Sequence, residues 1–236
     1  MSTKEYKKLI IIPAYNEAKN LIDLIKEIES VAEEYDYIII NDCSTDNTSI
    51  VCEENKFHCL NLPTNLGIGG AVQTGYIYAM ENNYDIAVQV DGDGQHNPEY
   101  LQEMFATLED NHADMVVGSR FIENEGFQSS FMRRIGIGYF TGLIKIVTGE
   151  NITDPTSGFR MIGRDLIREF AKDYPIDYPE PESVVEAIKS GYRVKEIPVM
   201  MKERQGGESS INKSKSVYYM IKVSLAILFE CIRRHK

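Results

Sequence analysis

Tryptophan is absent from this 236-residue sequence, and cysteine is scarce, with four residues in all. The cysteines form no C-x-x-C pair and have no histidine at the spacing of zinc ligands, which argues against a structural zinc site. The N-terminal residues contain no apolar h-region or cleavage site, so we expect no secretory signal. These absences predict reduced thiols and a cytoplasmic location.

Positive charge is also in short supply. The formal net charge is −11, and no basic stripe interleaved with aromatic residues counteracts it, so we expect no nucleic acid partner. The charge is uneven, however: residues 193–236 hold ten Lys and Arg against four Asp and Glu, whereas residues 1–192 hold 15 against 32. This basic C-terminal part could face anionic lipid.

Two common nucleotide-binding signatures are missing. No G-x-x-x-x-G-K-[ST] sequence occurs, which argues against a P-loop NTPase. The first apolar run is not followed by G-x-G-x-x-G, which argues against a dinucleotide oxidoreductase. A glycine-rich stretch does occur at residues 65–70, and it could either cradle a phosphate or serve only close helix packing.

The chain also lacks a linker rich in Pro, Gly or Ser, and its composition is that of an ordinary globular protein, with 43% hydrophobic residues. We therefore predict one α/β domain over residues 1–205. Residues 206–236 would follow as a flexible loop and a C-terminal amphipathic helix.

Short apolar runs alternate with helical patterns in the first 110 residues. Three runs are typical of strands buried on both faces of a parallel sheet, namely residues 9–12, 37–40 and 86–90. Apolar residues recur at helical spacing over residues 21–32, 69–80 and 98–108. This alternation predicts right-handed β-α-β units and a mostly parallel sheet flanked by helices.

Chemistry is expected where the strands end, because ligands of open α/β sheets bind beyond the carboxyl ends of the strands. Asp91 and Asp93 flank a glycine after the third run, and with Gln95 they could converge on one Mg²⁺ or Mn²⁺ ion. A diphosphate would complete the shell of that ion. Asp42 follows the second run, and its carboxylate could accept N–H groups of a nucleobase.

Seven motifs, taken in order, make the sequence resemble glycosyltransferase family 2 with the Rossmann-like GT-A fold. The resemblance is greatest to the dolichyl-phosphate mannosyltransferase-like branch, whose members use polyprenyl phosphate, and it spans residues 8–215. The motifs are Pro13-Ala14-Tyr15-Asn16-Glu17, Asn41-Asp42-Cys43-Ser44-Thr45-Asp46, Asn65-Leu66-Gly67, Asp91-Gly92-Asp93-Gly94-Gln95-His96, Gly118-Ser119-Arg120, Asp154-Pro155-Thr156-Ser157-Gly158-Phe159-Arg160 and Arg204 with residues 206–216.

The resemblance implies an inverting, metal-dependent transferase that moves a hexose or N-acetylhexosamine from a UDP- or GDP-sugar to polyprenyl phosphate. By this resemblance the nucleotide sugar would be held by Pro13, Tyr15, Glu17, Asp42, Asp91, Gly92, Asp93, Gln95, Arg204 and Lys213. The metal ligands would be Asp91, Asp93 and Gln95, and the catalytic residues Asp93 and Asp154. The acceptor phosphate would lie near Arg120, Arg133, Arg134 and Ser157.

Two departures from the family pattern leave alternatives open. The usual Asp-Asp-Gly-Ser is Asn41-Asp42-Cys43-Ser44 here, so Asp42 is the only acid of that pair. Glu182 could take the place of the catalytic acid of relatives that glycosylate hydroxyls, or it could only place charge at a helix N-terminus. The chain could accordingly be a polysaccharide glycosyltransferase acting on a sugar hydroxyl. It could also be a non-catalytic nucleotide-sugar-binding subunit of a membrane complex.

The C-terminal segment predicts an amphipathic helix whose interior Lys222 and Glu230 argue against a transmembrane span. The helix could pack on its own domain or in a homo-oligomer, lie on the membrane surface, or dock on a small membrane-protein partner. We expect a peripheral protein on the inner face of the plasma membrane. The predicted apolar side comprises Tyr218, Ile221, Leu225, Leu228, Phe229 and Ile232.

Overall fold

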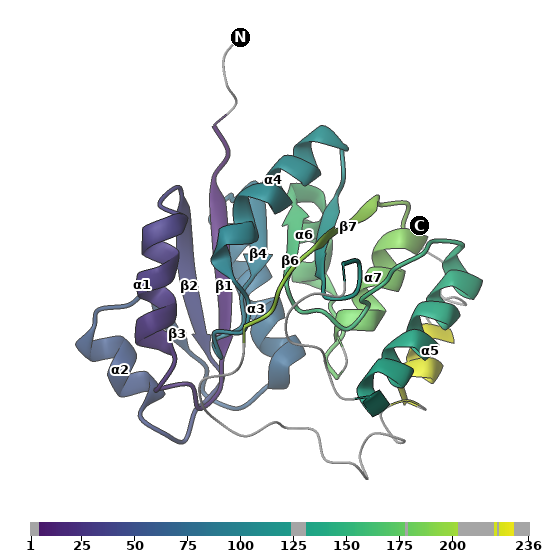
Figure 1. Cartoon of the computed structure of the whole chain (residues 1–236). Helices are drawn as coiled ribbons and strands as arrows, with labels where there is room; N and C mark the ends of the chain where they lie inside the picture. Colours follow the sequence, from purple (N-terminus) through teal and green to yellow (C-terminus); the bar gives the residue numbers. More distant parts are fainter. Residues whose placement is uncertain (1–4, 124–130, 178, 203–219, 221, 229–236) are drawn as a thin grey trace.

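A computed structural model describes residues 5–123, 131–177, 179–202, 220 and 222–228. Its strands form one sheet in the order β3-β2-β1-β4-β6-β5-β7 (Figure 1). The strands are β1 Lys8–Ala14, β2 Tyr35–Asn41, β3 Cys59–Asn61, β4 Ile86–Gln89, β5 Met115–Ser119, β6 Arg160–Gly163 and β7 Val194–Pro198. The helices are α1 Leu21–Val31, α2 Thr48–Glu54, α3 Gly67–Glu81, the short 3₁₀ helix η1 Pro98–Tyr100, α4 Leu101–Asp110, α5 Phe131–Thr148, α6 Arg164–Lys172 and α7 Pro179–Lys189.

The central strand of the sheet is buried on both faces. Residues 9–12 of β1 have no exposed surface, and β1 pairs in parallel with both β2 and β4. One cluster of buried side chains joins the sheet to α1 and α4, and a second joins it to α3, α5, α6 and α7. Helices therefore cover both faces (Figure 1), and the prediction of a helix-flanked, mostly parallel sheet is confirmed.

β6 is the strand that the sequence patterns did not reveal. It runs antiparallel to both of its neighbours, β4 and β5, and it is only four residues long. Its reversed direction brings the residues just before β6 to the edge of the sheet where β4 and β5 end. The segment 154–159 consequently lies beside the residues that follow β4 and β5.

The glycine-rich start of α3 serves close packing. A Cβ atom on Gly69 would lie 2.3 Å from the backbone oxygens of Pro175 and Ile176, and a Cβ atom on Gly75 would lie 2.2 Å from Cγ2 of Ile11. Both glycines let α3 approach its neighbours more closely than a side chain allows. Of the two interpretations of residues 65–70, close helix packing is the one that this geometry supports.

The described C-terminal residues, 222–228, are helical and pack on their own domain. Val223 and Ile227 have no exposed surface and belong to the same buried cluster as α5 and α7. Ser224 Oγ lies 3.0 Å from the Tyr139 hydroxyl of α5. Leu225 and Leu228, which we predicted on the apolar side, are 49% and 45% exposed, and the side of the helix that packs on the domain is that of Val223 and Ile227.

The remaining residues of the predicted apolar side, Tyr218, Ile221, Phe229 and Ile232, lie outside the described residues. Within the described part of the chain, no helix has the length and apolar character needed to cross a bilayer.

We expect Gly75→Ala to lower the free energy of unfolding by about 1–3 kcal/mol, because the added methyl group would overlap Ile11 in the core. Urea unfolding monitored by circular dichroism would measure the change. Gly142→Ala in α5 is the matched control: nothing lies within 4 Å of its Cβ position, so it should be neutral or stabilising by up to about 1 kcal/mol. Equal unfolding midpoints for the two variants would contradict the packing argument.

Candidate active site

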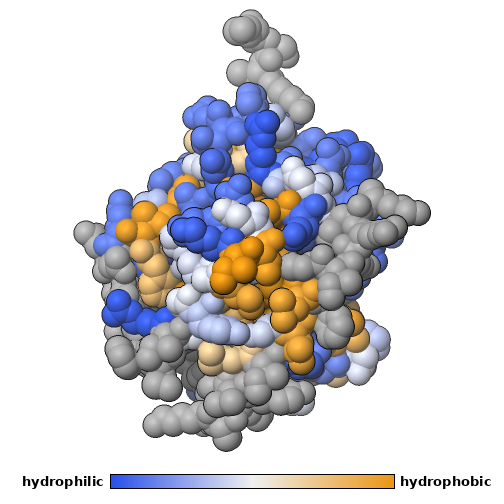
Figure 2. All heavy atoms as spheres, turned by 90° about the vertical axis from the view of Figure 1, so that its right-hand side faces the viewer, coloured by the Kyte–Doolittle hydropathy of each residue, from blue (hydrophilic) through white to orange (hydrophobic). Residues whose placement is uncertain are grey.

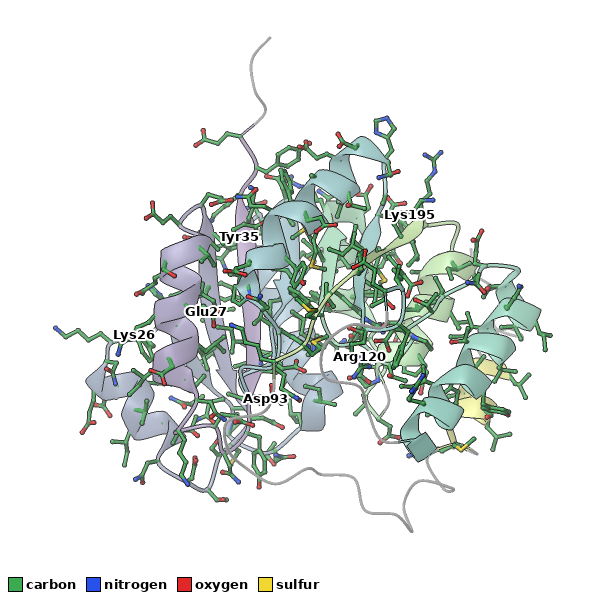
Figure 3. The ribbon with its side chains drawn as sticks, viewed as in Figure 1. Lys26, Glu27, Tyr35, Asp93, Arg120 and Lys195 are labelled. Atoms are coloured by element: carbon green, nitrogen blue, oxygen red, sulfur yellow. The ribbon has the colours of Figure 1, made fainter. Side chains whose placement is uncertain are left out.

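Residues that follow three strands, and a segment that precedes a fourth, meet at one edge of the sheet. Asp91 follows β4, Arg120 follows β5, the segment 154–159 precedes β6, and residues 199–202 follow β7. β4 and β5 are separated only by β6, which places their ends about 10 Å apart. Figure 3 shows Asp93 and Arg120 at this edge.

The turn after β4 carries the predicted metal ligands. Asp91 Oδ1 accepts a hydrogen bond from Gln89 Nε2 at 2.7 Å, and Asp93 Oδ1 accepts the Gln95 N–H at 3.0 Å. The Asp91 N–H donates to His96 Nδ1 at 3.0 Å, which leaves the hydrogen of a neutral His96 on Nε2. That Nε2 lies 3.6 Å from Asp91 Oδ2. His96 thus binds the backbone of Asp91 and lies near its carboxylate, a role that sequence analysis did not assign.

Two glycines make room around this turn. A Cβ atom on Gly92 would lie 3.0 Å from the Pro13 carbonyl oxygen, and a Cβ atom on Gly158 would lie 3.2 Å from Asp91 Oδ2. A Cβ atom on Gly158 would also lie 2.8 Å from Gln89 Nε2, so a larger residue there would displace the Gln89 side chain, which binds Asp91.

The donor set of the turn fits a hard divalent cation. Asp91 and Asp93 offer carboxylate oxygens, and Gln95 offers an amide oxygen. No group of three or more His, Cys, Asp and Glu side chains suited to a metal occurs among the residues described. Two carboxylates and one amide leave several coordination positions for phosphate oxygens, which is the arrangement that Mg²⁺ sites with phosphate substrates use.

The loop after β1 is joined to the loop after β2 through Asn16. Asn16 has a φ of 61°, in the left-handed region that asparagine tolerates. Its Oδ1 accepts the N–H groups of Thr45 at 2.8 Å and of Asp46 at 3.2 Å, and its own N–H donates to Ser44 Oγ at 2.9 Å. Asn16 was quoted in the motif but not assigned a role, because its partners are 28–30 residues away.

The two predicted nucleoside residues that follow β1 differ in exposure. Tyr15 is 48% exposed, whereas Glu17 is 7% exposed. The Glu17 carboxylate accepts a hydrogen bond from Asn20 Nδ2 at 2.6 Å, and its N–H donates to Thr48 Oγ1 at 3.0 Å. Tyr15 is accordingly open to a ligand, whereas Glu17 is buried and its hydrogen bonds stabilise the loop after β1.

Asp42 has an internal role in addition to the predicted one. Its Oδ1 accepts the Leu66 N–H at 2.7 Å, its Oδ2 accepts the Gly67 N–H at 2.9 Å, and the side chain is 4% exposed. The carboxylate thus satisfies N–H groups at the N-terminus of α3, where a negative charge is stabilised. An Asp42 contact with a nucleobase stays a prediction and would use the remaining lone pairs of the carboxylate.

Arg120 and Asp154 form a bidentate ion pair. Arg120 Nε donates to Asp154 Oδ2 at 2.7 Å, and Arg120 Nη2 donates to Asp154 Oδ1 at 2.8 Å. The Asp154 side chain has no exposed surface, whereas that of Arg120 is 12% exposed. A buried carboxylate with both oxygens engaged is placed to orient the guanidinium. Its predicted catalytic role stays a prediction.

Glu196 of β7 binds the backbone at Asp154 and so helps to position the ion pair. Its carboxylate accepts the N–H groups of Thr153 at 2.7 Å and of Asp154 at 2.9 Å. Burial raises the pKa of Glu196, and these two backbone hydrogen bonds oppose the rise. Sequence analysis missed Glu196, whose strand gives no sign of a partner 42 residues earlier.

Arg160 shapes the segment before β6 from within the core. It is 1% exposed, and its guanidinium donates to the carbonyls of Pro155 and Ser157 and to Ser183 Oγ at 2.6–2.9 Å. Ser157 is also 1% exposed, and its Oγ accepts the Phe159 N–H at 3.3 Å. Ser157 therefore lies inside the loop, and its predicted contact with the acceptor stays a prediction.

The other predicted residues are less informative. Arg134 lies exposed on the first turn of α5, and Glu182 lies in the first turn of α7. The side chains of Arg133, Arg204 and Lys213 lie outside the described part of the chain.

A small open hollow adjoins Arg120. It lies between the start of α4 and the ends of β5 and β7. Its lining residues are Tyr100, Ser119, Arg120, Glu123, Pro198, Val199 and Met200. Within the described structure Arg120 Nη1 has no hydrogen-bond partner, so this atom remains available to a ligand.

The fold and this site define a nucleotide-sugar transferase of the GT-A class. The sequence model of glycosyl transferase family 2 matches residues 9–170, more than half of the chain. The chain belongs to glycosyltransferase family 2, as the ordered motifs predicted.

Curated relatives cover most of the chain. An undecaprenyl-phosphate mannosyltransferase of Micrococcus luteus is 30% identical over 216 residues, 86% of this chain and 87% of the relative. A polyprenol monophosphomannose synthase of Mycolicibacterium smegmatis is 26% identical and covers 92% and 86%. A UDP-N-acetylglucosamine--dolichyl-phosphate N-acetylglucosaminyltransferase of Methanococcus voltae is 28% identical and covers 80% and 83%.

Solved structures share the fold at low sequence identity. The glucosyl-3-phosphoglycerate synthase of Mycobacterium tuberculosis in complex with phosphoglyceric acid superposes with a TM-score of 0.74 at 16% identity. The superposition covers 97% of this chain and 81% of the synthase. The same enzyme with Mn²⁺, uridine diphosphate and phosphoglyceric acid gives a TM-score of 0.72. These similarities confirm the predicted GT-A fold.

We expect Asp42→Ala to lower both stability and donor affinity. The Leu66 and Gly67 N–H groups would lose their acceptor, at a cost of about 1–3 kcal/mol in the free energy of unfolding. Asp42→Asn, which keeps one acceptor oxygen, should lose less. Urea unfolding and calorimetric titration with UDP and GDP measure the two effects. Unchanged stability of Asp42→Ala would refute the helix-end role, and unchanged nucleotide affinity would refute the donor role.

Proposed function

We propose that this protein transfers a hexose or N-acetylhexosamine, with inversion, from a UDP- or GDP-sugar to a polyprenyl phosphate of the undecaprenyl or dolichyl type. The observation that carries the proposal is Arg120, which Asp154 holds in a fixed orientation at a hollow on the strand-end edge. The curated relatives, two mannosyltransferases and an N-acetylglucosaminyltransferase, are named for polyprenyl-phosphate acceptors. They support the same acceptor class here.

The donor would bind on the β1, β2 and β4 side of the edge. Asp91, Asp93 and Gln95 would hold Mg²⁺ or Mn²⁺, and Tyr15 would contact the nucleoside from its exposed position. When bound, the cation offsets negative charge that develops on the departing nucleoside diphosphate. Gly92 and Gly158 carry no side chains that would crowd the turn. The space beside the two carboxylates would then be left to the diphosphate.

The acceptor would bind on the β5 and β7 side. A phosphate is already an anion at neutral pH, so it needs a cationic partner more than a strong general base. Arg120 offers its Nη1 edge to such a phosphate, while its other edge is bound to Asp154. The ends of β4 and β5 are about 10 Å apart. This separation supports binding of donor and acceptor on opposite sides of the transferred sugar.

Glu123 is the observation that would favour a sugar hydroxyl as acceptor. It lines the hollow beside Arg120, and a carboxylate there could take a proton from an attacking hydroxyl. In that case Glu123→Gln would abolish transfer. With a phosphate acceptor, the same substitution should leave turnover within about threefold of wild type.

The membrane surface is the proposed working place, with the protein peripheral on the inner face. Figure 2 shows hydrophobic residues gathered on the face formed by α5 and its neighbours. Ile146 on α5 is 83% exposed, and Leu225 and Leu228 of the C-terminal helical residues are about half exposed. Exposed Lys145 and Arg134 on α5 could add attraction to anionic lipid. A small membrane-protein partner or a second copy of the chain would compete for the same face.

We expect Asp93→Ala to reduce transfer at least a hundredfold while leaving the melting temperature unchanged, because it removes a ligand of a cation worth several kcal/mol. The assay mixes enzyme, membranes and a panel of labelled nucleotide sugars, and it measures the label that enters the organic phase. Asp110→Ala, a matched change at the end of α4, should be active. Full wild-type turnover in excess chelator would overturn the metal assignment, and label that stays in the aqueous polymer would overturn the lipid acceptor.

We expect Ile146→Glu and Leu225→Glu each to lower flotation with anionic phospholipid vesicles by about three- to tenfold, since each removes apolar surface from the proposed contact. Ile50→Glu on α2 is the control, because Ile50 is 51% exposed on another helix. If all three variants float like the wild type, this face does not contact lipid. Hydrolysis of the nucleotide sugar should be the same in all of them.

A further inference from the structure

The chain that leaves β7 crosses the strand-end edge toward α1. We call residues 199–202 the β7 extension. Its Val199 N–H donates to the Ser119 carbonyl at 2.9 Å, and its Met200 N–H donates to the Tyr100 hydroxyl at 3.2 Å. Figure 1 shows this segment running from β7 across the sheet edge toward α1. The β7 extension therefore links the acceptor side of the edge to the donor side.

At its far end the β7 extension is bound to Gln95 by two hydrogen bonds. The Lys202 N–H donates to the Gln95 carbonyl at 2.9 Å, and Gln95 Nε2 donates to the Lys202 carbonyl at 3.3 Å. The side-chain amide of glutamine has one donor end and one acceptor end. Because its donor end faces Lys202, its Oε1 is turned to the other side of the amide. Oxygen is the atom that a hard cation requires.

The side chain of Lys202 is itself held by an ion pair. Its Nζ contacts Glu27 Oε1 on α1, and the two side chains are 37% and 31% exposed. Glu27 lies on α1 (Figure 3), a helix whose Leu24, Ile25 and Ile28 are buried against the sheet. This ion pair thus fixes the end of the β7 extension to a rigid element of the donor side.

We propose that Glu27 and Lys202 are positioning residues for Gln95: their ion pair holds the Lys202 backbone where it orients the Gln95 amide with its oxygen available to the cation. The inference rests on the proposed function, because it concerns the cation expected at Asp91, Asp93 and Gln95. Neither residue is one of the expected cation ligands. Groups that orient metal ligands contribute to metal affinity even without contacting the metal.

The test measures Mn²⁺ affinity and not turnover. Free Mn²⁺ is followed by electron paramagnetic resonance in the presence of UDP or GDP, whichever the wild type binds, and the melting temperature is recorded for every variant. The variants are Glu27→Gln, Lys202→Met, the two together, and the charge exchange Glu27→Lys with Lys202→Glu. Glu29→Gln is the matched control, an exposed glutamate on the same helix.

Each single variant should weaken Mn²⁺ binding by about two- to fivefold, the range expected for a partly exposed ion pair. The double variant should bind as the singles do, because both changes break one interaction, and the charge exchange should restore affinity toward wild type. Glu29→Gln should bind like the wild type. A purely structural pair would lower the melting temperature without changing Mn²⁺ affinity.

The inference is overturned if the single variants bind Mn²⁺ like the wild type, if their losses add in the double variant, or if the charge exchange restores nothing. The proposed function fails in a different way. In that case the wild type itself shows no Mn²⁺ binding that Asp93→Ala removes, or no label reaches lipid. The positioning role is supported when the wild type shows Asp93-dependent Mn²⁺ binding and the Glu27 and Lys202 variants bind Mn²⁺ more weakly. This result does not depend on whether label reaches lipid.

Discussion

The ion pair between Arg120 and Asp154 is the interaction on which the β5 and β7 side of the site, the proposed acceptor side, depends. Asp154 has no exposed surface, and a buried carboxylate without a counter-charge would be strongly destabilising. Arg120 supplies that charge, and Glu196 binds the Asp154 N–H, so the ends of β5 and β7 and the segment before β6 are joined. The guanidinium at the hollow is oriented as a result, because the fold requires its other edge for Asp154.

The β1, β2 and β4 side, the proposed donor side, is built on a different principle, in which side chains from distant loops accept hydrogen bonds from backbone N–H groups. Asp42 accepts the N–H groups at the start of α3, Asn16 accepts those of the loop after β2, and His96 accepts that of Asp91. Each contact leaves the loop in one conformation before any ligand binds, which lowers the ordering cost of binding. The β7 extension then ties this side to the acceptor side through Gln95 and Lys202.

Local patterns in the sequence were enough to predict the parallel half of the sheet and the turn at Asp91 and Asp93. Short apolar runs and the residues that follow them carry this information, because burial and strand ends are local properties. The four-residue β6, with a buried arginine as its first residue, gave no comparable signal. The roles of Asn16, His96 and Glu196 depend on partners elsewhere in the fold, and so does the helix-end role of Asp42. For the C-terminal residues, helical spacing predicted an apolar side, but the residues buried in the core are Val223 and Ile227, which are not on that side.

The antiparallel β6 also has a consequence for the order of folding. β1 pairs with β2 and with β4 within the first 90 residues, whereas β4 pairs with β6 across more than 70 residues, as in Ile86 with Gly163. Contacts between residues so far apart in sequence form slowly, because the loop must be closed before the contacts stabilise it. During synthesis β1, β2 and β4 can assemble first, with the edge of β4 unpaired until β6 emerges. An unpaired strand edge is a template for association with other chains, so the interval between β4 and β6 is when a nascent chain is most exposed to aggregation.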